Sequence, residues 1–334
     1  MVTPPQKVLI LHSGGIGDLF LALPALRIFR RAFRRATLEL MGRPERLALV
    51  AFDLQAQSIH SIDQAGMAYF YANGGTLPPR LSAFFSSFIT VLVFGKDSGN
   101  ILAKNMGRAG VERVIPIPSF PPKESAIHVS DYLIEALRAA GIAGQSLSSP
   151  LRLPQKALGF ARRFWAGFGL QEGQRILAIH PGSGSPAKNW DPKKFARVAD
   201  WSSERCKILL ISGPAQDGVE EVRGSMKKAR PLVADNLPLI HLAAVLKAST
   251  AYLGNDSGIT HLAASLGLPT VAIFGPTNPA IWGPRGPRVH IICAKNPCAP
   301  CSPEARSACS RPCLQSIEPD SVIEVLSPFL GLLP

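Results

Sequence analysis

The stretch 250–277, TAYLGNDSGITHLAASLGLPTVAIFGPT, decides the fold of this chain. An apolar run over Ala251–Leu253 gives way to the turn Gly254–Gly258, whose middle residues are polar. Residues 259–266 then place apolar side chains at helical spacing, and Thr270–Phe274 is a second run rich in β-branched residues. A strand, a turn, a helix and a strand in this order form the crossover that two parallel strands need. The sequence therefore predicts a parallel α/β sheet.

The turn Gly254–Gly258 is predicted to lie where the carboxyl end of a strand meets the amino end of a helix. Backbone N–H groups are unpaired at a helix amino end and the helix dipole is positive there, so this turn favours an anion. Asp256 or Ser257 could instead serve only as the helix cap. Two further glycine-rich turns, 13–18 (SGGIGD) and 181–185 (PGSGS), follow other predicted strands and strengthen the ligand-binding interpretation.

The length of 334 residues and the repeated alternation of strand and helix predict two α/β domains. The predicted bounds are 1–150, 151–318 and a last helix, 319–334, that packs back on the domains; a linker rich in Gly, Ser and Pro spans 141–156. The predicted strands are Lys7–Leu11, Thr37–Met41, Ile59–Ile62, Thr90–Phe94, Arg113–Ile115, Ile176–His180, Lys207–Ile211, Ala251–Leu253 and Thr270–Phe274. Two doubly wound halves follow from this pattern.

The formal net charge of +13 favours an anionic partner. Five arginines on one predicted amphipathic helix, Arg27, Arg30, Arg31, Arg34 and Arg35, are either a solvated face or an attraction to an anionic membrane or a phosphorylated substrate. Nucleic acid is disfavoured, because no basic patch is interleaved with the aromatic residues that stack on bases. No apolar stretch reaches the length of a membrane span and no signal peptide is recognisable, so a cytoplasmic protein is expected.

The first glycine-rich turn does not fit a dinucleotide fingerprint. In the frame that begins at Gly15, the third glycine is replaced by Phe20, although Glu39 lies at a suitable distance for a ribose. One glycine-rich turn in each half instead predicts a cleft with a ligand on both sides.

Three blocks resemble the signature blocks of glycosyltransferase family 9, the ADP-heptose:lipopolysaccharide heptosyltransferases: 13–27 (SGGIGDLFLALPALR), 180–190 (HPGSGSPAKNW) and 253–279 (LGNDSGITHLAASLGLPTVAIFGPTNP). The resemblance implies a GT-B architecture, two Rossmann-like domains facing across a cleft, with the donor on the C-terminal half. It also implies an inverting transfer of heptose from ADP-heptose or a similar nucleotide sugar. The acceptor would be an anionic lipopolysaccharide precursor, linked to lipid A and Kdo, at the inner face of the inner membrane with peripheral membrane contact.

The resemblance also implies roles for individual residues. Asp18 is similar to the family's catalytic base, within the acceptor-side turn formed by Ser13, Gly14, Gly15 and Gly17. Donor binding is implied for Ser183, Gly184, Ser185 and Lys188 (phosphate turn), Asp217 (ribose), Leu237 (adenine), Asp256 (donor sugar), Gly258 and Ile259 (diphosphate amides), and for Ser257 and His261. The run 213–217, GPAQD, departs from the family's usual GGPAE-like pattern, so the position of Asp217 is the least well matched.

The residues themselves agree with this chemistry. Transfer from a nucleotide diphosphate needs a base for the acceptor hydroxyl and a group that neutralises the departing diphosphate. No DxD-type pair suggests a metal, and Lys188 with the helix amino ends could stabilise that charge, so no cofactor is expected in catalysis. Alternatives are a relative with another nucleotide-sugar donor, a nucleotide-sugar epimerase that relies on Asp256 and His261, or a non-catalytic binder. A binder would not need Asp18.

Four cysteines share one predicted loop: Cys298, Cys301, Cys309 and Cys313. Their spacing, C-x2-C-x7-C-x3-C, is compatible with a structural zinc site, and reduced thiols or a redox-sensitive disulfide is the alternative. The remaining two, Cys206 and Cys293, are expected to be small buried hydrophobic residues.

Overall fold

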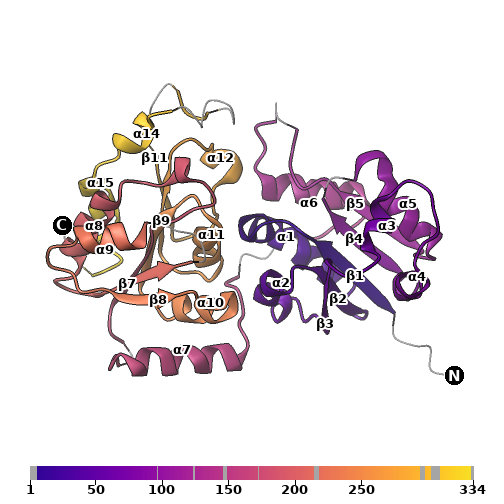
Figure 1. Ribbon diagram of the computed structural model, residues 1–334, viewed down its shortest axis with the longest axis horizontal. Helices are drawn as coiled ribbons and strands as arrows, with labels where there is room; N and C mark the ends of the chain where they lie inside the picture. Colours follow the sequence, from indigo (N-terminus) through magenta and orange to yellow (C-terminus); the bar gives the residue numbers. More distant parts are fainter. Residues whose placement is uncertain are drawn as a thin grey trace. The chain divides into compact units, whose positions relative to one another are not determined.

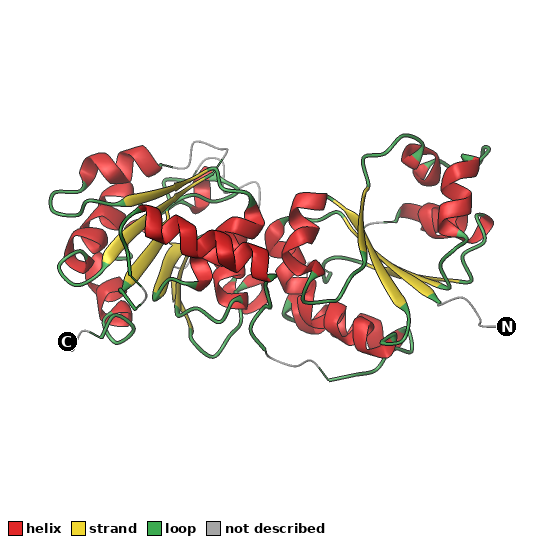
Figure 2. Ribbon diagram, turned by 90° about the horizontal axis from the view of Figure 1, so that it is seen from below, coloured by secondary structure: helices red, strands yellow, loops and turns green. Residues whose placement is uncertain are grey.

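The computed structural model describes residues 6–95, 97–122, 125–145, 149–171, 173–213, 218–293, 298–301 and 309–331. The chain divides into two compact units, Met1–Ser148 (unit 1) and Ser149–Pro334 (unit 2), coloured indigo to magenta and magenta to yellow in Figure 1. Each unit has its own parallel sheet with helices on both faces, as Figure 2 shows. The predicted mixed α/β class with two doubly wound sheets is therefore confirmed.

The sheet of unit 1 has the strand order β3-β2-β1-β4-β5 and is parallel throughout. Val8 to Leu11 in the central strand are at most 1% exposed, as expected for a strand covered on both faces. The strands are β1 (Lys7–His12), β2 (Thr37–Gly42), β3 (Ser58–Ser61), β4 (Thr90–Phe94) and β5 (Arg113–Ile117). The helices are α1 (Ile16–Ala32), α2 (Pro44–Ala51), α3 (Met67–Tyr71), α4 (Pro79–Phe85), α5 (Ile101–Arg108) and α6 (Val129–Ala139), with a 3-10 turn, η1, at Ser98–Asn100.

Apolar packing on both faces holds the unit 1 sheet. One face packs Leu9, Met41 and Val93 against aromatic residues of α3 and α4, among them Phe70 and Phe85. The other face is covered by α1, which packs on α6. Helix α1 runs through Pro24, and it begins at Ile16, three residues before the start at Leu19 that the apolar pattern predicts.

The sheet of unit 2 has the order β11-β10-β9-β6-β7-β8 and is also parallel throughout. Its strands are β6 (Ile176–His180), β7 (Lys207–Ser212), β8 (Leu232–Asp235), β9 (Ala251–Asn255), β10 (Thr270–Phe274) and β11 (Val289–Cys293). Its helices are α7 (Gln155–Gly167), α8 (Pro192–Ser202), α9 (Val219–Ser225), α10 (Leu239–Lys247), α11 (Gly258–Ser265), α12 (Pro279–Trp282), α14 (Pro312–Gln315) and α15 (Pro319–Leu326), with a 3-10 turn, η2, at Pro186–Lys188.

Two strands of unit 2 were not predicted, β8 and β11. Both lie at the edges of the sheet and most of their side chains are half-buried or exposed. Edge strands of this kind lack the continuous apolar run that identified the central strands. The helix predicted over Ser125–Ala140 begins only at Val129, because the His128 ring accepts a hydrogen bond from the Ser130 N–H and caps the helix.

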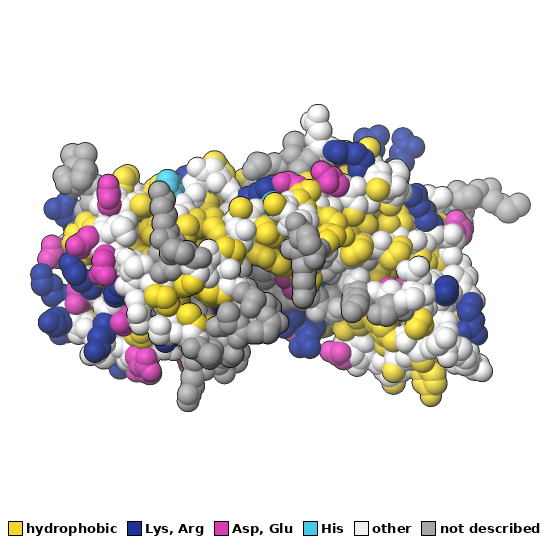
Figure 3. Space-filling model, turned by 90° about the horizontal axis from the view of Figure 1, so that it is seen from above, with side chains coloured by type: hydrophobic (Ala, Val, Ile, Leu, Met, Phe, Trp, Pro, Cys, Tyr) yellow, Lys and Arg dark blue, Asp and Glu magenta, His cyan; other side chains and the backbone are white. Residues whose placement is uncertain are grey.

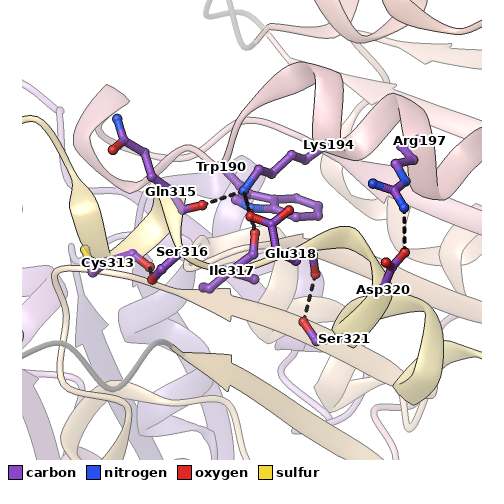
Figure 4. A network of polar contacts seen from close by, with 10 residues as sticks. All are labelled: Trp190, Lys194, Arg197, Cys313, Gln315, Ser316, Ile317, Glu318, Asp320 and Ser321. Carbon is purple, nitrogen blue, oxygen red and sulfur yellow. Dashed lines mark hydrogen bonds and ion pairs between the residues drawn. The ribbon is translucent and has the colours of Figure 1, made fainter.

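The segment that contains α14 and α15 is part of the unit 2 core. Figure 4 shows Trp190, which precedes α8, and Lys194, in the first turn of α8, bonded to backbone oxygens of this segment. The indole N–H of Trp190 donates to the Ile317 carbonyl at 3.1 Å, and Lys194 Nζ donates to the same oxygen at 2.9 Å. Val322 and Leu326 on α15 are fully buried. These contacts fix α15 against α8.

Much of the charge on the outer surface of unit 2 is paired. In Figure 3, Lys and Arg side chains are interspersed with Asp and Glu at the end of unit 2 that carries α8, α9 and α15. The ion pairs there are Lys194–Glu318, Arg197–Asp320, Arg223–Glu220 and Lys228–Glu204. Such exposed pairs contribute little stability.

Most of the predicted arginine face of α1 is used by the fold. Three of its arginines bond within unit 1: Arg27 Nε to Asp53 Oδ2 at 2.8 Å, Arg30 Nη1 to the Phe33 carbonyl at 2.8 Å, and Arg31 Nη1 to the Gln145 carbonyl at 2.9 Å. Arg34 and Arg35 are exposed. Among the described residues, no helix has the length and apolar character that crossing a bilayer requires.

Candidate active site

The start of α11 is fixed by a network of buried hydroxyl groups. Ser257 is the N-cap, and its Oγ accepts a hydrogen bond from the Thr260 N–H at 3.3 Å. Thr260 Oγ1 lies 3.0 Å from both Ser257 Oγ and the Tyr252 hydroxyl, and it also bonds the Asn255 carbonyl. Because Gly258 and Ile259 occupy the first helical turn, their N–H groups have no acceptor within the helix. The capping role is therefore real for Ser257, and it leaves these two amides available for an anion.

Asp256 is not the cap but one half of an ion pair. Its side chain is 8% exposed, and Oδ2 lies 2.7 Å from Nζ of Lys188. From the described residues, no hydrogen bond of regular geometry reaches this Oδ2, and the Lys188 ammonium compensates its charge. Lys188 ends the η2 turn after β6, and Asp256 follows β9, the neighbouring strand. The carboxyl ends of adjacent parallel strands thus bring two sequence-predicted residues together.

The phosphate turn predicted at Ser183–Ser185 is held by its own side chains. The Ser183 hydroxyl oxygen lies 2.6 Å from both the Ser185 carbonyl oxygen and Asn189 Oδ1. It also accepts a hydrogen bond from the Ser185 N–H at 3.2 Å. Gly184 is exposed at the tip of the turn. The turn therefore offers its backbone, rather than the Ser183 hydroxyl, to a ligand.

Asn255 joins this turn to the start of α11 and was missed by the sequence reasoning. Its side chain is fully buried, donates from Nδ2 to the Pro181 carbonyl at 2.5 Å, and accepts from the Trp190 N–H at 3.0 Å. His180, also buried, has its Nδ1 3.4 Å from Ser257 Oγ. The signal available in the sequence was an asparagine directly after an apolar strand, where a buried amide must find partners.

Fewer contacts are recorded for the two remaining predicted donor residues that the structure describes, His261 and Leu237. His261 is buried on α11, and its backbone N–H donates to the Ser257 carbonyl at 3.3 Å. Leu237 is half-buried in the loop between β8 and α10. Asp217 lies outside the described residues, so its predicted ribose contact stays a prediction.

In unit 1, the predicted catalytic carboxylate caps its own helix from within. Asp18 is the third residue of α1, and its Oδ2 accepts a hydrogen bond from the N–H of the N-cap residue Gly15 at 2.8 Å. Arg46, from α2, donates from Nη1 to the Gly14 carbonyl at 2.8 Å. Asp18 and Gly17 are half-buried, whereas Ser13 is exposed.

His12 lies behind this turn. Its ring is buried, and burial lowers its pKa to about 4, so it is neutral at pH 7. A Cβ atom on Gly14 would lie 3.0 Å from both His12 Cε1 and Asp18 Oδ2. Any other residue at this position would therefore crowd the imidazole and the carboxylate. Neither His12 nor Arg46 was singled out from the sequence.

The structure places the six cysteines in no disulfide bond with one another. Cys313 is buried, and burial together with the nearby thiols of Cys301, Cys298 and Cys309 raises its pKa. Within the described part of the chain, no three candidate ligands gather into a metal site. Cys206 is buried as expected, and burial raises its pKa to about 11. The expectation for Cys293 was wrong: it is exposed, because it ends the edge strand β11.

Comparisons with known proteins agree on one family. The family model described as glycosyltransferase family 9 (heptosyltransferase) matches residues 120–310. Lipooligosaccharide heptosyltransferase 2 of Campylobacter jejuni is 30% identical over 189 residues, which cover 54% of this chain and 58% of that protein. The chain thus spans little more than half the length of the curated relatives it matches first.

Solved structures show the same fold over both units. A glycosyl transferase family 9 protein from Veillonella parvula superposes with a TM-score of 0.79 at 18% identity, covering 99% of both chains. The ADP-heptose lipopolysaccharide heptosyltransferase II of E. coli gives a TM-score of 0.76 at 17% identity, covering 98% of this chain and 99% of that one. At such identities the likeness establishes the architecture alone.

Proposed function

Because the chain belongs to glycosyltransferase family 9, the heptosyltransferases, we propose that it transfers heptose, with inversion, from ADP-heptose to a lipopolysaccharide core acceptor linked to lipid A and Kdo. The observation that carries this proposal is the Lys188–Asp256 pair beside the open amides of α11. The names of the similar heptosyltransferases support the choice of heptose as the transferred sugar.

Unit 2 is proposed to bind the donor. The positive end of α11 and the Gly258 and Ile259 amides suit the diphosphate, and the Lys188 ammonium adds a full charge. These groups are in place before the bond breaks, so they can stabilise the departing diphosphate without a metal. Asp256 holds the Lys188 ammonium in place at 2.7 Å and is itself proposed to contact the donor sugar. Asp217 and Leu237 are proposed neighbours of the ribose and the adenine.

Unit 1 is proposed to supply the base. One oxygen of the Asp18 carboxylate is held by the Gly15 N–H, and the turn Ser13–Gly17 brings little side-chain bulk near it. In the proposed reaction, Asp18 removes the proton of the acceptor hydroxyl as that oxygen attacks the anomeric carbon of the donor. The bond from this carbon to the diphosphate breaks, and ADP leaves with the negative charge.

The cellular setting follows from the proposed acceptor. Its lipid anchor supports action in the cytoplasm at the inner face of the inner membrane, with peripheral contact to anionic lipid. Zinc binding by the loop of Cys298, Cys301, Cys309 and Cys313 rests on spacing alone, and no catalytic step is assigned to it. Elemental analysis of protein purified without chelator tests it: about one zinc per chain supports the site, and none removes the idea.

The proposed function is tested with a panel of nucleotide sugars. ADP-heptose should raise the melting temperature more than UDP- or GDP-sugars, and ADP should be released only when the lipid A/Kdo acceptor is present. Stabilisation by another nucleotide sugar would reassign the donor. Conversion of the sugar without an acceptor would indicate an epimerase, and binding with no conversion would indicate a non-catalytic binder.

A further inference from the structure

One peptide unit connects Arg46 to the proposed catalytic carboxylate. The Gly14 carbonyl accepts a hydrogen bond from Arg46 Nη1 at 2.8 Å, and the Gly15 N–H donates to Asp18 Oδ2, also at 2.8 Å. This carbonyl and this N–H belong to the same peptide bond, which is planar and rigid. The Arg46 guanidinium and the Asp18 carboxylate therefore bond opposite ends of a single planar peptide group.

Close packing restricts the movement of the Gly14–Gly15 peptide. A Cβ on Gly14 would meet Asp18 and His12 at 3.0 Å, so the peptide packs directly against both side chains. Arg46 reaches the turn from the first turn of α2, which follows β2, the neighbour of β1. The site is thus assembled from the carboxyl ends of two adjacent strands.

We propose that Arg46 is a positioning residue for Asp18: it fixes the Gly14–Gly15 peptide, and this peptide fixes the carboxylate that accepts the proton. A guanidinium that donates to a carbonyl polarises the peptide, and the N–H at its other end becomes a stronger donor. That N–H stabilises the ionised carboxylate and occupies Oδ2. The second oxygen, Oδ1, accepts no hydrogen bond within the described part of the chain and remains for the acceptor hydroxyl.

The other titratable groups near the turn do not supply this charge. His12, from β1, is buried, and its lowered pKa of about 4 keeps it neutral at pH 7. At the start of α6, which packs on α1, His128 is the helix cap that accepts from the Ser130 N–H, and Asp131 carries a negative charge. Arg46 is the cation that these two hydrogen bonds connect to Asp18 through the Gly14–Gly15 peptide.

The test compares Arg46→Gln, Arg46→Lys and a control, Arg43→Gln, which changes an exposed arginine on the same turn. Arg46→Gln should lower kcat by roughly 10–100-fold with an unchanged KM for ADP-heptose, because the donor is proposed to bind unit 2. Since the ionised carboxylate loses a stabiliser, the acidic limb of the kcat–pH profile should move to higher pH. Arg46→Lys keeps the charge and should lose less, and Arg43→Gln should match the unchanged protein.

This inference rests on the proposed role of Asp18, so Asp18→Asn is measured in parallel. An active Asp18→Asn variant would overturn the base assignment itself. If Asp18→Asn is inactive while Arg46→Gln keeps its kcat and its acidic limb, only the role of Arg46 is wrong. A rise in KM for the acceptor alone would make Arg46 a binding residue and would also overturn the proposal. Melting curves and ADP binding confirm that each variant is folded. If Arg46→Gln does not fold, the same comparison is made with Arg46→Lys.

Discussion

At the residue scale, Asp18 combines a structural and a proposed chemical role, and one substitution separates them. Asparagine can still accept the Gly15 N–H, so Asp18→Asn should melt within a few degrees of the unchanged protein and bind ADP normally. An amide cannot accept the proton, so kcat should fall by about 10²–10⁴-fold. Steady-state transfer at saturating substrates measures this, with Asp63→Asn, an exposed acid of unit 1, as the control. Turnover within a few-fold of the control would place the base elsewhere.

Lys188 gives a second residue-scale prediction. Lys188→Ala should weaken ADP binding by about 1.5–3 kcal/mol, the usual value of a charge-assisted hydrogen bond. The same change leaves the Asp256 carboxylate buried without its cation, so it should also lower the melting temperature. Asp256→Asn added to Lys188→Ala should restore stability but not affinity.

Calorimetric titration with ADP and parallel melting curves separate these two effects of Lys188. The exposed Lys193, five residues further on, provides the control substitution Lys193→Ala. Equal ADP affinity in Lys188→Ala and Lys193→Ala would contradict a role for Lys188 at the diphosphate.

The sequence predicted the pair itself but not what holds it. Lys188 and Asp256 follow apolar strands with clear ends, and the carboxyl ends of parallel strands lie together by topology. Asn255, Arg46 and His12 act through hydrogen bonds to distant backbone atoms or through packing at the turn. No local periodicity records such tertiary contacts, so these residues could not be found from the pattern alone.

At the element scale, the central strands were predictable because they are continuous apolar runs, whereas β8, β11 and the use of the α1 arginines were not. The first strands of unit 1 also hold a charge cluster around the buried Glu39, which the pattern did not reveal. Glu39 on β2 lies 2.9 Å from Lys7 Nζ on β1 and 2.6 Å from His60 Nε2 on β3. Three neighbouring strands are therefore linked by one carboxylate.

This cluster predicts how the stability of unit 1 depends on pH. Burial acts to raise the pKa of Glu39, but the hydrogen bonds and charges of Lys7 and His60 outweigh it and lower the pKa. Because the folded pKa is the lower one, the stabilisation is complete above the unfolded value near 4.3 and is lost as the pH falls through the folded value. Glu39→Gln should cost about 1–2 kcal/mol at pH 7 and much less at pH 3.

Urea denaturation of unchanged protein and Glu39→Gln at both pH values checks this prediction. Glu45→Gln, an exposed acid on α2, is the matched control. A Glu39→Gln deficit that is the same at pH 3 and pH 7 would show that packing, rather than the carboxylate charge, supports these strands.

At the scale of the whole molecule, part of the arginine cluster within the net charge of +13 is held by the fold. Arg27 pairs with Asp53, and Arg30 and Arg31 bond backbone carbonyls of unit 1, whereas Arg34 and Arg35 are exposed. Binding to anionic vesicles should therefore be weak, should fall with added salt, and should fall further in the Arg34→Gln/Arg35→Gln variant. Sedimentation with anionic and with zwitterionic vesicles measures it. If vesicle binding changed neither with added salt nor in the Arg34→Gln/Arg35→Gln variant, the contact with the membrane would be non-electrostatic.

The buried, hydrogen-bonded Trp190 can serve as a fluorescent probe of the turn that carries Lys188. The indole is 1% exposed and bonded to Ile317, and the Trp190 backbone is bonded to Asn255, the residue before Asp256. An indole in such dry surroundings fluoresces at shorter wavelengths than one in water. With Trp165, Trp201 and Trp282 replaced by Phe, the emission of Trp190 would follow the turn that carries Lys188 through unfolding and ligand binding. Loss of the hydrogen bond between Trp190 and Asn255, as in Asn255→Ala, would appear as a red shift before any activity is measured.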